Sequence, residues 1–441
     1  MKQLTRLFIP ICLETLFYML SGMVDTLMLS AVGDYAVGAV GTANSYIGIF
    51  IIMFSIISSG MVSVMTQNIG AGRPGVAYQA RQLGLLFNAV AGVLMAVFLF
   101  SGAGAILRMV GIADALYEPA LIYLKIVGGG CILNAVIPIF SSYLRAFGYT
   151  KQPLYATIVG NIANFVMNAV FLFVLHKGVA GVATATVISK ILNLGIVLYF
   201  SHKLISAKNS TERIANKTVL GQIVKVGLPS ACETALYNVA MMLVIRFLNQ
   251  MDAEGLNVTA RSYTATISNF SYCVGAALAQ ANAIMTGWHI GAGELEECDR
   301  GTKRAAFVGV CVAVCMETAI VLGSGFIMPL FTDNPEMTAL VRKLLAIDIV
   351  LEIGRVTNLV FGQALKTSGD AVFPAVIAAV FMFVFAVGGT WLFGISMGLM
   401  AGGAGFGAVG AYIGLASDEC VRAVGMVWRW KTGKWRTKKL V

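Results

Sequence analysis

Long apolar runs, separated by short polar stretches, dominate this chain. Twelve segments are each apolar over about 20 residues or more, the length at which a helix crosses a bilayer. They cover residues 7–30, 38–66, 82–107, 118–144, 152–175, 179–200, 222–250, 259–287, 303–329, 338–365, 372–395 and 404–428. The pattern predicts an all-α integral membrane protein with twelve transmembrane helices.

The second half of the sequence repeats the first in order and spacing. Four residues of the first span recur 219 positions later: Pro10, Glu14, Thr15 and Tyr18 become Pro229, Glu233, Thr234 and Tyr237. Further matches lie 221 positions apart: Leu144, Gly148 and Pro153 become Leu365, Gly369 and Pro374, and the loop 69–72 becomes 290–293. Duplicated helical bundles are common in transporters, which hold the substrate between the repeats.

The repeat predicts two pseudo-symmetric six-helix bundles. An even number of spans gives both halves the same orientation, related by an axis along the membrane normal. We assign residues 1–200 to the N-terminal lobe and 222–430 to the C-terminal lobe. The polar stretch 201–221 is interpreted as a cytoplasmic linker, and residues 431–441 as a basic cytoplasmic tail.

Composition and charge agree with a membrane protein. Of the 441 residues, 58% are hydrophobic and 12% are charged, whereas soluble domains have about 25% charged residues. Mean hydropathy is +0.83 and the net charge is +10. Most of the 31 basic residues fall at the N-terminus, in alternate connections and in the tail, which predicts a plasma-membrane protein with both termini in the cytoplasm. Because they flank apolar spans instead of forming a basic domain, we expect no nucleic-acid binding.

Several functional classes lack a sequence signal. The eight cysteines are scattered, and no histidine or further cysteine completes a zinc set around Cys311 and Cys315. No glycine-rich loop follows a strand, and no Ser-His-Asp signature is present. We therefore expect a protein that is not an enzyme and that has no cofactor.

The first span carries a carboxylate inside its apolar stretch, where inserting a charged group into the bilayer costs free energy. Asp25 lies in an apolar stretch, and the spacing of Glu14, Tyr18, Ser21 and Asp25 places them on one helical stripe. A carboxyl group there can hold a proton or a small cation, and its occupancy then depends on pH. A structural hydrogen bond or a place near the headgroups is the alternative. For Glu14 and Glu233, near their helix starts, a favourable interaction with the helix dipole is the alternative.

Two later spans also carry polar stripes. One face of the fifth span carries three amides, Asn161, Asn164 and Asn168. These amides can ligate a cation or bond to Asp25, and hydrogen bonding between helices is the alternative. The tenth span holds Asp348, Glu352, Arg355 and Asn358. We interpret Glu352 and Arg355 as a buried pair, structural or gating, and place Asp348 nearer the water interface.

Several short motifs resemble the MATE (multidrug and toxic compound extrusion) transporters over essentially the whole chain. They are Pro10 with residues 22–25 (GMVD), residues 67–73 (QNIGAGR), 144–153 (LRAFGYTKQP), 181–186 (GVATAT) and their second-half counterparts. The resemblance implies twelve helices in two lobes and cation-coupled export of organic, often cationic, compounds.

The resemblance also implies site residues. The coupling acid of the family's first helix falls on Asp25, the fifth-helix asparagine on Asn164 and the sixth-helix threonine on Thr186. Asn168 stands where relatives often have aspartate. Many relatives also have an acid in the seventh helix and another in the tenth. Here the seventh-helix position is matched by Tyr237, with Glu233 one turn earlier, and the tenth-helix position falls near Arg355.

We therefore expect a secondary active antiporter that exports organic, drug-like, cationic compounds in exchange for protons or sodium ions, with any sodium held at Asp25. We expect a monomer whose partners are small organic substrates and the lipid bilayer. A lipid-linked oligosaccharide flippase of the same superfamily is the alternative, and it requires a strongly cationic cavity. Only Arg355, Lys125, Lys190 and Arg246 are candidate basic residues inside spans. An ion channel and a membrane-embedded enzyme are further alternatives.

Overall fold

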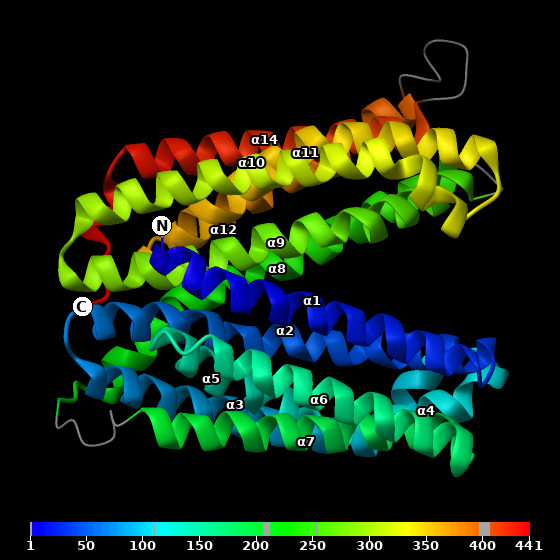
Figure 1. The fold of residues 1–441 in the computed structure, drawn as a ribbon, viewed down its shortest axis with the longest axis horizontal. Helices are drawn as coiled ribbons and strands as arrows, with labels where there is room; N and C mark the ends of the chain where they lie inside the picture. Colours follow the sequence, from blue (N-terminus) through cyan, green and yellow to red (C-terminus); the bar gives the residue numbers. More distant parts are fainter. Residues whose placement is uncertain (1, 110, 206–211, 252–254, 397–405) are drawn as a thin grey trace. The chain divides into compact units, whose positions relative to one another are not determined.

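The computed structural model describes residues 2–109, 111–205, 212–251, 255–396 and 406–441. These residues are almost entirely helical and include no strand. Figure 1 shows long helices lying roughly side by side within each half of the chain. Each of the twelve predicted spans coincides with a helical segment, apart from residues 397–405, which lie outside the described residues and include the predicted start of the twelfth span.

The described residues of the first half form seven α-helices, because one predicted span is divided. They are α1 (Lys2–Ser30), α2 (Asp34–Gly70), α3 (Pro74–Met109), α4 (Asp114–Gly129), α5 (Cys131–Ala146), α6 (Lys151–Ala169), continued by the π-helix η1 (Val170–Val174), and α7 (Gly178–Leu204).

The second half follows the same order. Its elements are α8 (Asn216–Met251), α9 (Leu256–Ala292), α10 (Leu295–Ile327) with the 3-10 turn η3 (Met328–Leu330), α11 (Pro335–Ser368), α12 (Val372–Phe381) with the π-helices η4 (Met382–Val387) and η5 (Thr390–Ser396), α14 (Gly407–Lys431) and the 3-10 turn η6 (Lys434–Thr437).

Length and apolarity support a membrane location. Among the described residues, eight helices are long and apolar enough to cross a membrane, and the count is nine if the bent pair α4 and α5 forms one span. That pair is bent by 41° at Gly130, after two further glycines, and adjacent glycines are a common cause of such a bend. The remaining predicted spans, α9, α11 and α14, carry more polar side chains.

The repeat seen in the sequence is also a repeat of backbone conformation. Gly72 and Gly293 both have positive φ, 74° and 79°, and so do Gly148 and Gly369, 85° and 97°. Each glycine ends a helix, and the amide of the residue that follows it bonds back to a carbonyl five residues earlier at 2.8–3.0 Å. Left-handed glycines with this bonding terminate helices. The fifth span of each half also ends in a π-helix, η1 and η5.

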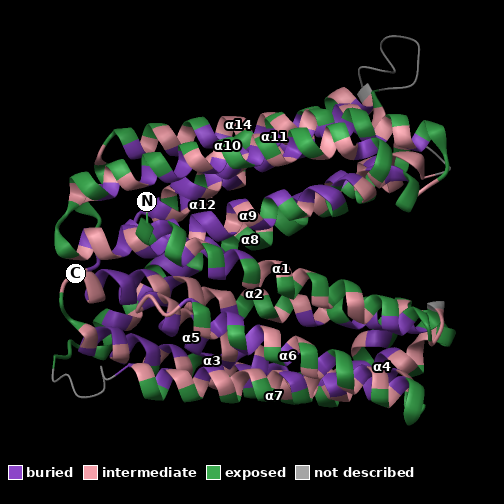
Figure 2. Ribbon diagram, in the orientation of Figure 1, coloured by how far each residue is buried: buried purple, intermediate pink, exposed green. Residues whose placement is uncertain are grey.

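The chain divides into two compact units, Thr5–Leu228 and Pro229–Leu440, so the division falls within α8. Each unit has its own apolar core. Leu99, Leu107 and Leu124 are fully buried in the first, and Val244, Leu344 and Met382 in the second. Figure 2 shows buried positions recurring along the helices of both units. The predicted linker 201–221 lies in the first unit where it is described, and residues 206–211 lie outside the described residues.

Candidate functional site

The first unit holds a carboxylate that is bound by amides. Asp25, near the end of α1, is half-buried. Its Oδ1 accepts a hydrogen bond from Nδ2 of Asn168 at 2.8 Å, and the same Nδ2 donates to Oδ1 of Asn164 at 3.2 Å. Asn164 is buried and Asn168 is completely so. Polar side chains therefore join α1 to α6 at this point.

The cluster of Asp25, Asn164 and Asn168 contains a hydrogen-bond acceptor that has no partner in the described part of the chain. Among the described residues, Oδ1 of Asn168 is buried and has no hydrogen-bond partner. Carboxylate and amide oxygens are the ligands that hard cations prefer, and a carboxylate can take a proton instead. Asp25 with Asn168 can therefore hold a proton or a small cation.

Two side chains of α7 lie near this carboxylate. Thr186 donates to the Val182 carbonyl of its own helix at 2.9 Å and contacts the hydroxyl of Tyr123 from α4, which interacts electrostatically with Asp25. Lys190, one turn further along α7, donates to Oδ1 of Asn134 at 2.8 Å and interacts electrostatically with Asp25. Sequence reasoning noted Lys190 only as a basic residue inside a span and did not connect it with Asp25.

The predicted stripe on α1 does not gather into one site. Glu14 lies about 16 Å from Asp25 along the helix and forms an ion pair with Arg145 of α5 at 2.5 Å. Tyr18 is 73% exposed. Asn161, the third amide of α6, donates to the backbone carbonyl of Phe17 at 2.9 Å and so joins helices.

The second unit contains an ion pair at matching positions. Glu233 of α8 forms an ion pair with Nζ of Lys366 in α11 at 2.8 Å. Glu233 corresponds to Glu14, and Lys366 to Arg145, in the internal repeat. Both glutamates are therefore held by a cation at the end of their lobe's fourth span.

The predicted pair on α11 lies inside a larger ion network. Arg355 bonds to Glu352 and lies 3.7 Å from Glu419 of α14. Nδ2 of Asn358 donates to Glu419 at 3.0 Å, and Arg422 contacts Glu419 at 2.8 Å. The structure thus brings Glu352, Arg355 and Asn358 together, and adds acids and an arginine of α14.

Three carboxyl groups form the most buried part of this network. Oxygen atoms of Glu317, Asp348 and Glu352 all lie within 4.8 Å of one another. The three residues are 0%, 2% and 0% exposed, so Asp348 is buried and the expected position near water is wrong. Both carboxyl oxygens of Glu317 are buried without a hydrogen-bond partner among the described residues. Such a group can hold a proton or a cation, because like charges this close disfavour each other.

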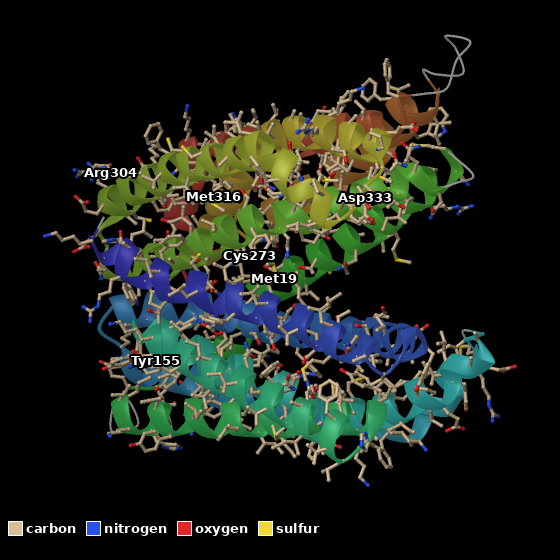
Figure 3. The ribbon with its side chains drawn as sticks, turned by 45° about the vertical axis from the view of Figure 1, so that its right-hand side comes forward. Met19, Tyr155, Cys273, Arg304, Met316 and Asp333 are labelled. Carbon is tan, nitrogen blue, oxygen red and sulfur yellow. The ribbon has the colours of Figure 1, made fainter. Side chains whose placement is uncertain are left out.

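A cavity of about 260 Å³ adjoins the network in the same unit. Its lining includes Tyr237, Arg261, Asp348, Arg355 and Tyr412. In Figure 3, Met316, the neighbour of Glu317, lies between the labelled residues Arg304 and Asp333 of this unit. Glu317 therefore lies along the length of the helical bundle and away from its ends.

Sequence reasoning missed several of these residues, although a signal was present. Glu317 interrupts an apolar run of α10, and Asp418, Glu419 and Arg422 interrupt α14. The rule that singled out Asp25, an ionisable residue inside a span, applies equally to them. Arg261 of α9 gave a weaker signal, because it lies close to its helix start.

Comparisons with known proteins support the fold and the kind of protein. A family model described as MatE matches residues 10–170 and 229–403. The chain is 32% identical over 435 residues to "Uncharacterized transporter YisQ" of Bacillus subtilis, covering 97% of this chain and 94% of that one. It is 20% identical over 453 residues to "Probable multidrug resistance protein NorM" of Thermotoga maritima, covering 100% and 94%.

A solved structure shares the fold. A MATE crystal structure in the bent conformation superposes with a TM-score of 0.84 at 20% identity, covering 99% of this chain and 96% of the other. With the family match over most of the chain, the fold, the duplicated helices and the buried polar groups describe a multi-pass membrane transporter and not an enzyme. The chain belongs to the MATE family of transporters.

Proposed function

We propose that this transporter is a secondary antiporter of the plasma membrane that exports organic compounds, cationic ones among them, in exchange for protons or sodium ions. The observation that carries this proposal is the Asp25 carboxyl group, placed within a span and bonded to Asn168, whose own Oδ1 has no hydrogen-bond partner among the described residues. An ion that binds there can shift the population of conformations, because it stabilises whichever state offers it the better ligands.

Lys190 competes with an arriving proton or sodium ion for the negative charge of Asp25. Its ammonium group attracts the Asp25 carboxylate when no ion is bound, and it remains bonded to Asn134. An arriving proton or sodium ion weakens that attraction, because it neutralises Asp25. Binding at Asp25 would then loosen α7 from α1, which links ion occupancy to helix movement.

Orientation and assembly follow from the charge pattern. Basic residues gather at both termini and in alternate connections, which supports cytoplasmic termini. We expect the chain to act as a monomer that binds small organic substrates and no nucleic acid. The flippase alternative has less support, since the carboxylates lining the described cavity outnumber its two arginines.

Gradient-driven transport in proteoliposomes tests the proposal. Purified protein is given a fluorescent organic cation, with pH and sodium gradients imposed separately. Wild type should accumulate the dye under at least one gradient, and Asp25→Asn should lose that response. Asp114→Asn, which changes an exposed aspartate of the same unit, is the matched control and should behave as wild type. Unchanged gradient response in Asp25→Asn would remove Asp25 from the mechanism.

A further inference from the structure

Charged side chains line the cavity of the second unit. Some of them contact an oppositely charged side chain, and two of them do not among the described residues. Arg355 is neutralised by Glu352 and Glu419. Asp418 bonds to Arg422 at 2.8 Å, and Glu419 bonds to the same arginine. Among the described residues that line this cavity, Arg261 and Asp348 remain without an oppositely charged side chain in contact.

Arg261 has unused donors. Its Nε is buried and has no hydrogen-bond partner in the described part of the chain. One of its terminal nitrogens contacts Sδ of Met241 at 3.6 Å, and a thioether is a weak acceptor. A guanidinium group is suited to binding a carboxylate with two parallel hydrogen bonds, so this position favours an anionic group.

Asp348 has an unused acceptor. The residue is 2% exposed, and its Oδ2 has no hydrogen-bond partner among the described residues. Carboxyl groups of Glu317 and Glu352 lie within 4.8 Å of it, and these three acids outnumber the one positive charge that Arg355 supplies. A cationic group beside Asp348 is favoured, because it stabilises the ionised form of these carboxyl groups.

The two groups do not pair with each other in the described part of the chain. Asp348 faces the hydroxyl of Ser268 on α9, and Arg261 lies seven residues earlier on the same helix. That is two helical turns, or about 10 Å along the axis. Tyr412 interacts electrostatically with both groups and lines the same cavity.

The walls between the two charges suit a small organic molecule. Three tyrosines and several aliphatic side chains line the cavity: Tyr237, Tyr272, Tyr412, Met241, Leu351 and Leu415. Tyrosine and methionine offer apolar and polarizable contact surface. At about 260 Å³ the cavity lies just below the range of about 300–1,000 Å³ that is typical of ligand pockets, so the ligand is small.

We infer that this cavity binds a small zwitterion, with its ammonium group at Asp348 and its carboxylate at Arg261. The inference rests on the proposed export function and names the substrate class of one lobe. A simple cation would satisfy Asp348 and leave Arg261 buried without an anion, and a simple anion would do the reverse. A ligand with both charges, separated by up to about 10 Å, satisfies both groups at once.

Binding of four matched probes to the purified full-length protein, measured by titration calorimetry in detergent, tests the inference. The probes are 4-[4-(aminomethyl)phenyl]butanoic acid, its methyl ester, its N-acetyl derivative and the doubly blocked compound. The zwitterion should bind at least about tenfold more tightly than either singly charged derivative, since each blocked end loses a charge-assisted hydrogen bond.

Variants assign that preference to Arg261. Arg261→Gln should bind the zwitterion no better than its methyl ester, and Arg261→Lys should keep part of the preference. Arg246→Gln, an exposed arginine of α8 outside the cavity lining, should behave as wild type. An ester that binds wild type as tightly as the zwitterion, or a zwitterion that does not bind, overturns the inference.

Calorimetry, taken together with the proteoliposome transport assay, separates this inference from the proposed function. If zwitterion binding depends on Arg261 but no ion gradient drives transport, the antiporter proposal fails and the binding site stands. If gradients drive transport of cations but the zwitterion binds no more tightly than its methyl ester, the antiporter proposal stands and the inferred zwitterion site is wrong.

Discussion

At the scale of single residues, the buried ion network of α11 and α14 should be costly to interrupt. Arg355 contacts Glu352, which is fully buried, and lies near Glu419. Replacing it by methionine leaves the fully buried Glu352 without its cationic partner, although Glu419 keeps Arg422, so Arg355→Met should lower the free energy of unfolding by about 3–5 kcal/mol. Chemical unfolding in detergent, followed by circular dichroism, measures the loss.

The double variant Glu352→Gln with Arg355→Met should lose less stability than the two single variants together, because each group is costly mainly when the other remains. Arg300→Met is the matched control. Arg300 pairs with Glu297 at the same i,i+3 spacing, but both side chains are more than half exposed, so its effect should stay below about 1 kcal/mol. Fully additive losses would show that Glu352 and Arg355 do not act as a pair.

Residue-level prediction from the sequence found the groups that stand on regular stripes, Asp25 with the asparagines of α6, and Glu352 with Arg355. It could not find that Lys190 interacts with Asp25, because that interaction depends on where the fold places helices that are far apart in the sequence. It also placed Asp348 near water, since position along a helix does not reveal which side chains cover it. Tertiary packing decides both points.

At the scale of helices, α11 and α14 approach closely because Gly354 has no side chain. A Cβ atom at Gly354 would lie 2.7 Å from the backbone nitrogen of Cys420 and 2.8 Å from the carbonyl carbon of Glu419. Those contacts involve backbone atoms, so the helices must move apart. Gly354→Ala should lower the free energy of unfolding by roughly 1–3 kcal/mol.

Gly362 of the same helix provides the comparison. A Cβ atom there would meet Oδ1 of Asn358 at 3.8 Å, an ordinary contact. Because alanine favours a helix interior over glycine by about 1 kcal/mol, Gly362→Ala should leave thermal stability unchanged or slightly higher. Equal melting temperatures for the two alanine variants would contradict the close approach at Gly354.

Most elements were predictable, for a simple reason. A span must be long and apolar, and the twelve runs of the sequence meet that requirement without reference to tertiary structure. The break at Gly130 and the π-helical ends of the fifth and eleventh spans were not predicted. These depend on local hydrogen bonding and on neighbouring helices, which leave no mark in hydrophobic periodicity.

At the scale of the whole molecule, the duplication extends from sequence to ion pairs. The first half pairs Glu14 with Arg145, and the second pairs Glu233 with Lys366. Each half therefore uses a different base for the same contact. Arg145→Lys and Lys366→Arg should both keep wild-type melting temperatures within a few degrees, since in each case the other half makes the corresponding ion pair with the opposite base.

Removing the base is a different change. Arg145→Met and Lys366→Met should each lower the melting temperature by more than the base exchange does, because a partly buried glutamate is left alone. Differential scanning fluorimetry of the four variants makes the comparison. A base exchange as damaging as the methionine variant would show that the two halves do not share this contact.

If ion binding at Asp25 is coupled to substrate export, a substrate gradient must also be able to move the coupling ion. Proteoliposomes with wild-type protein receive a substrate gradient alone, and internal pH and sodium are monitored with fluorescent indicators. In wild type, substrate moving down its gradient should drive one of these ions uphill in the opposite direction. Asp25→Asn should abolish this ion movement. Substrate flux through wild type with no opposing movement of either ion would contradict this coupling.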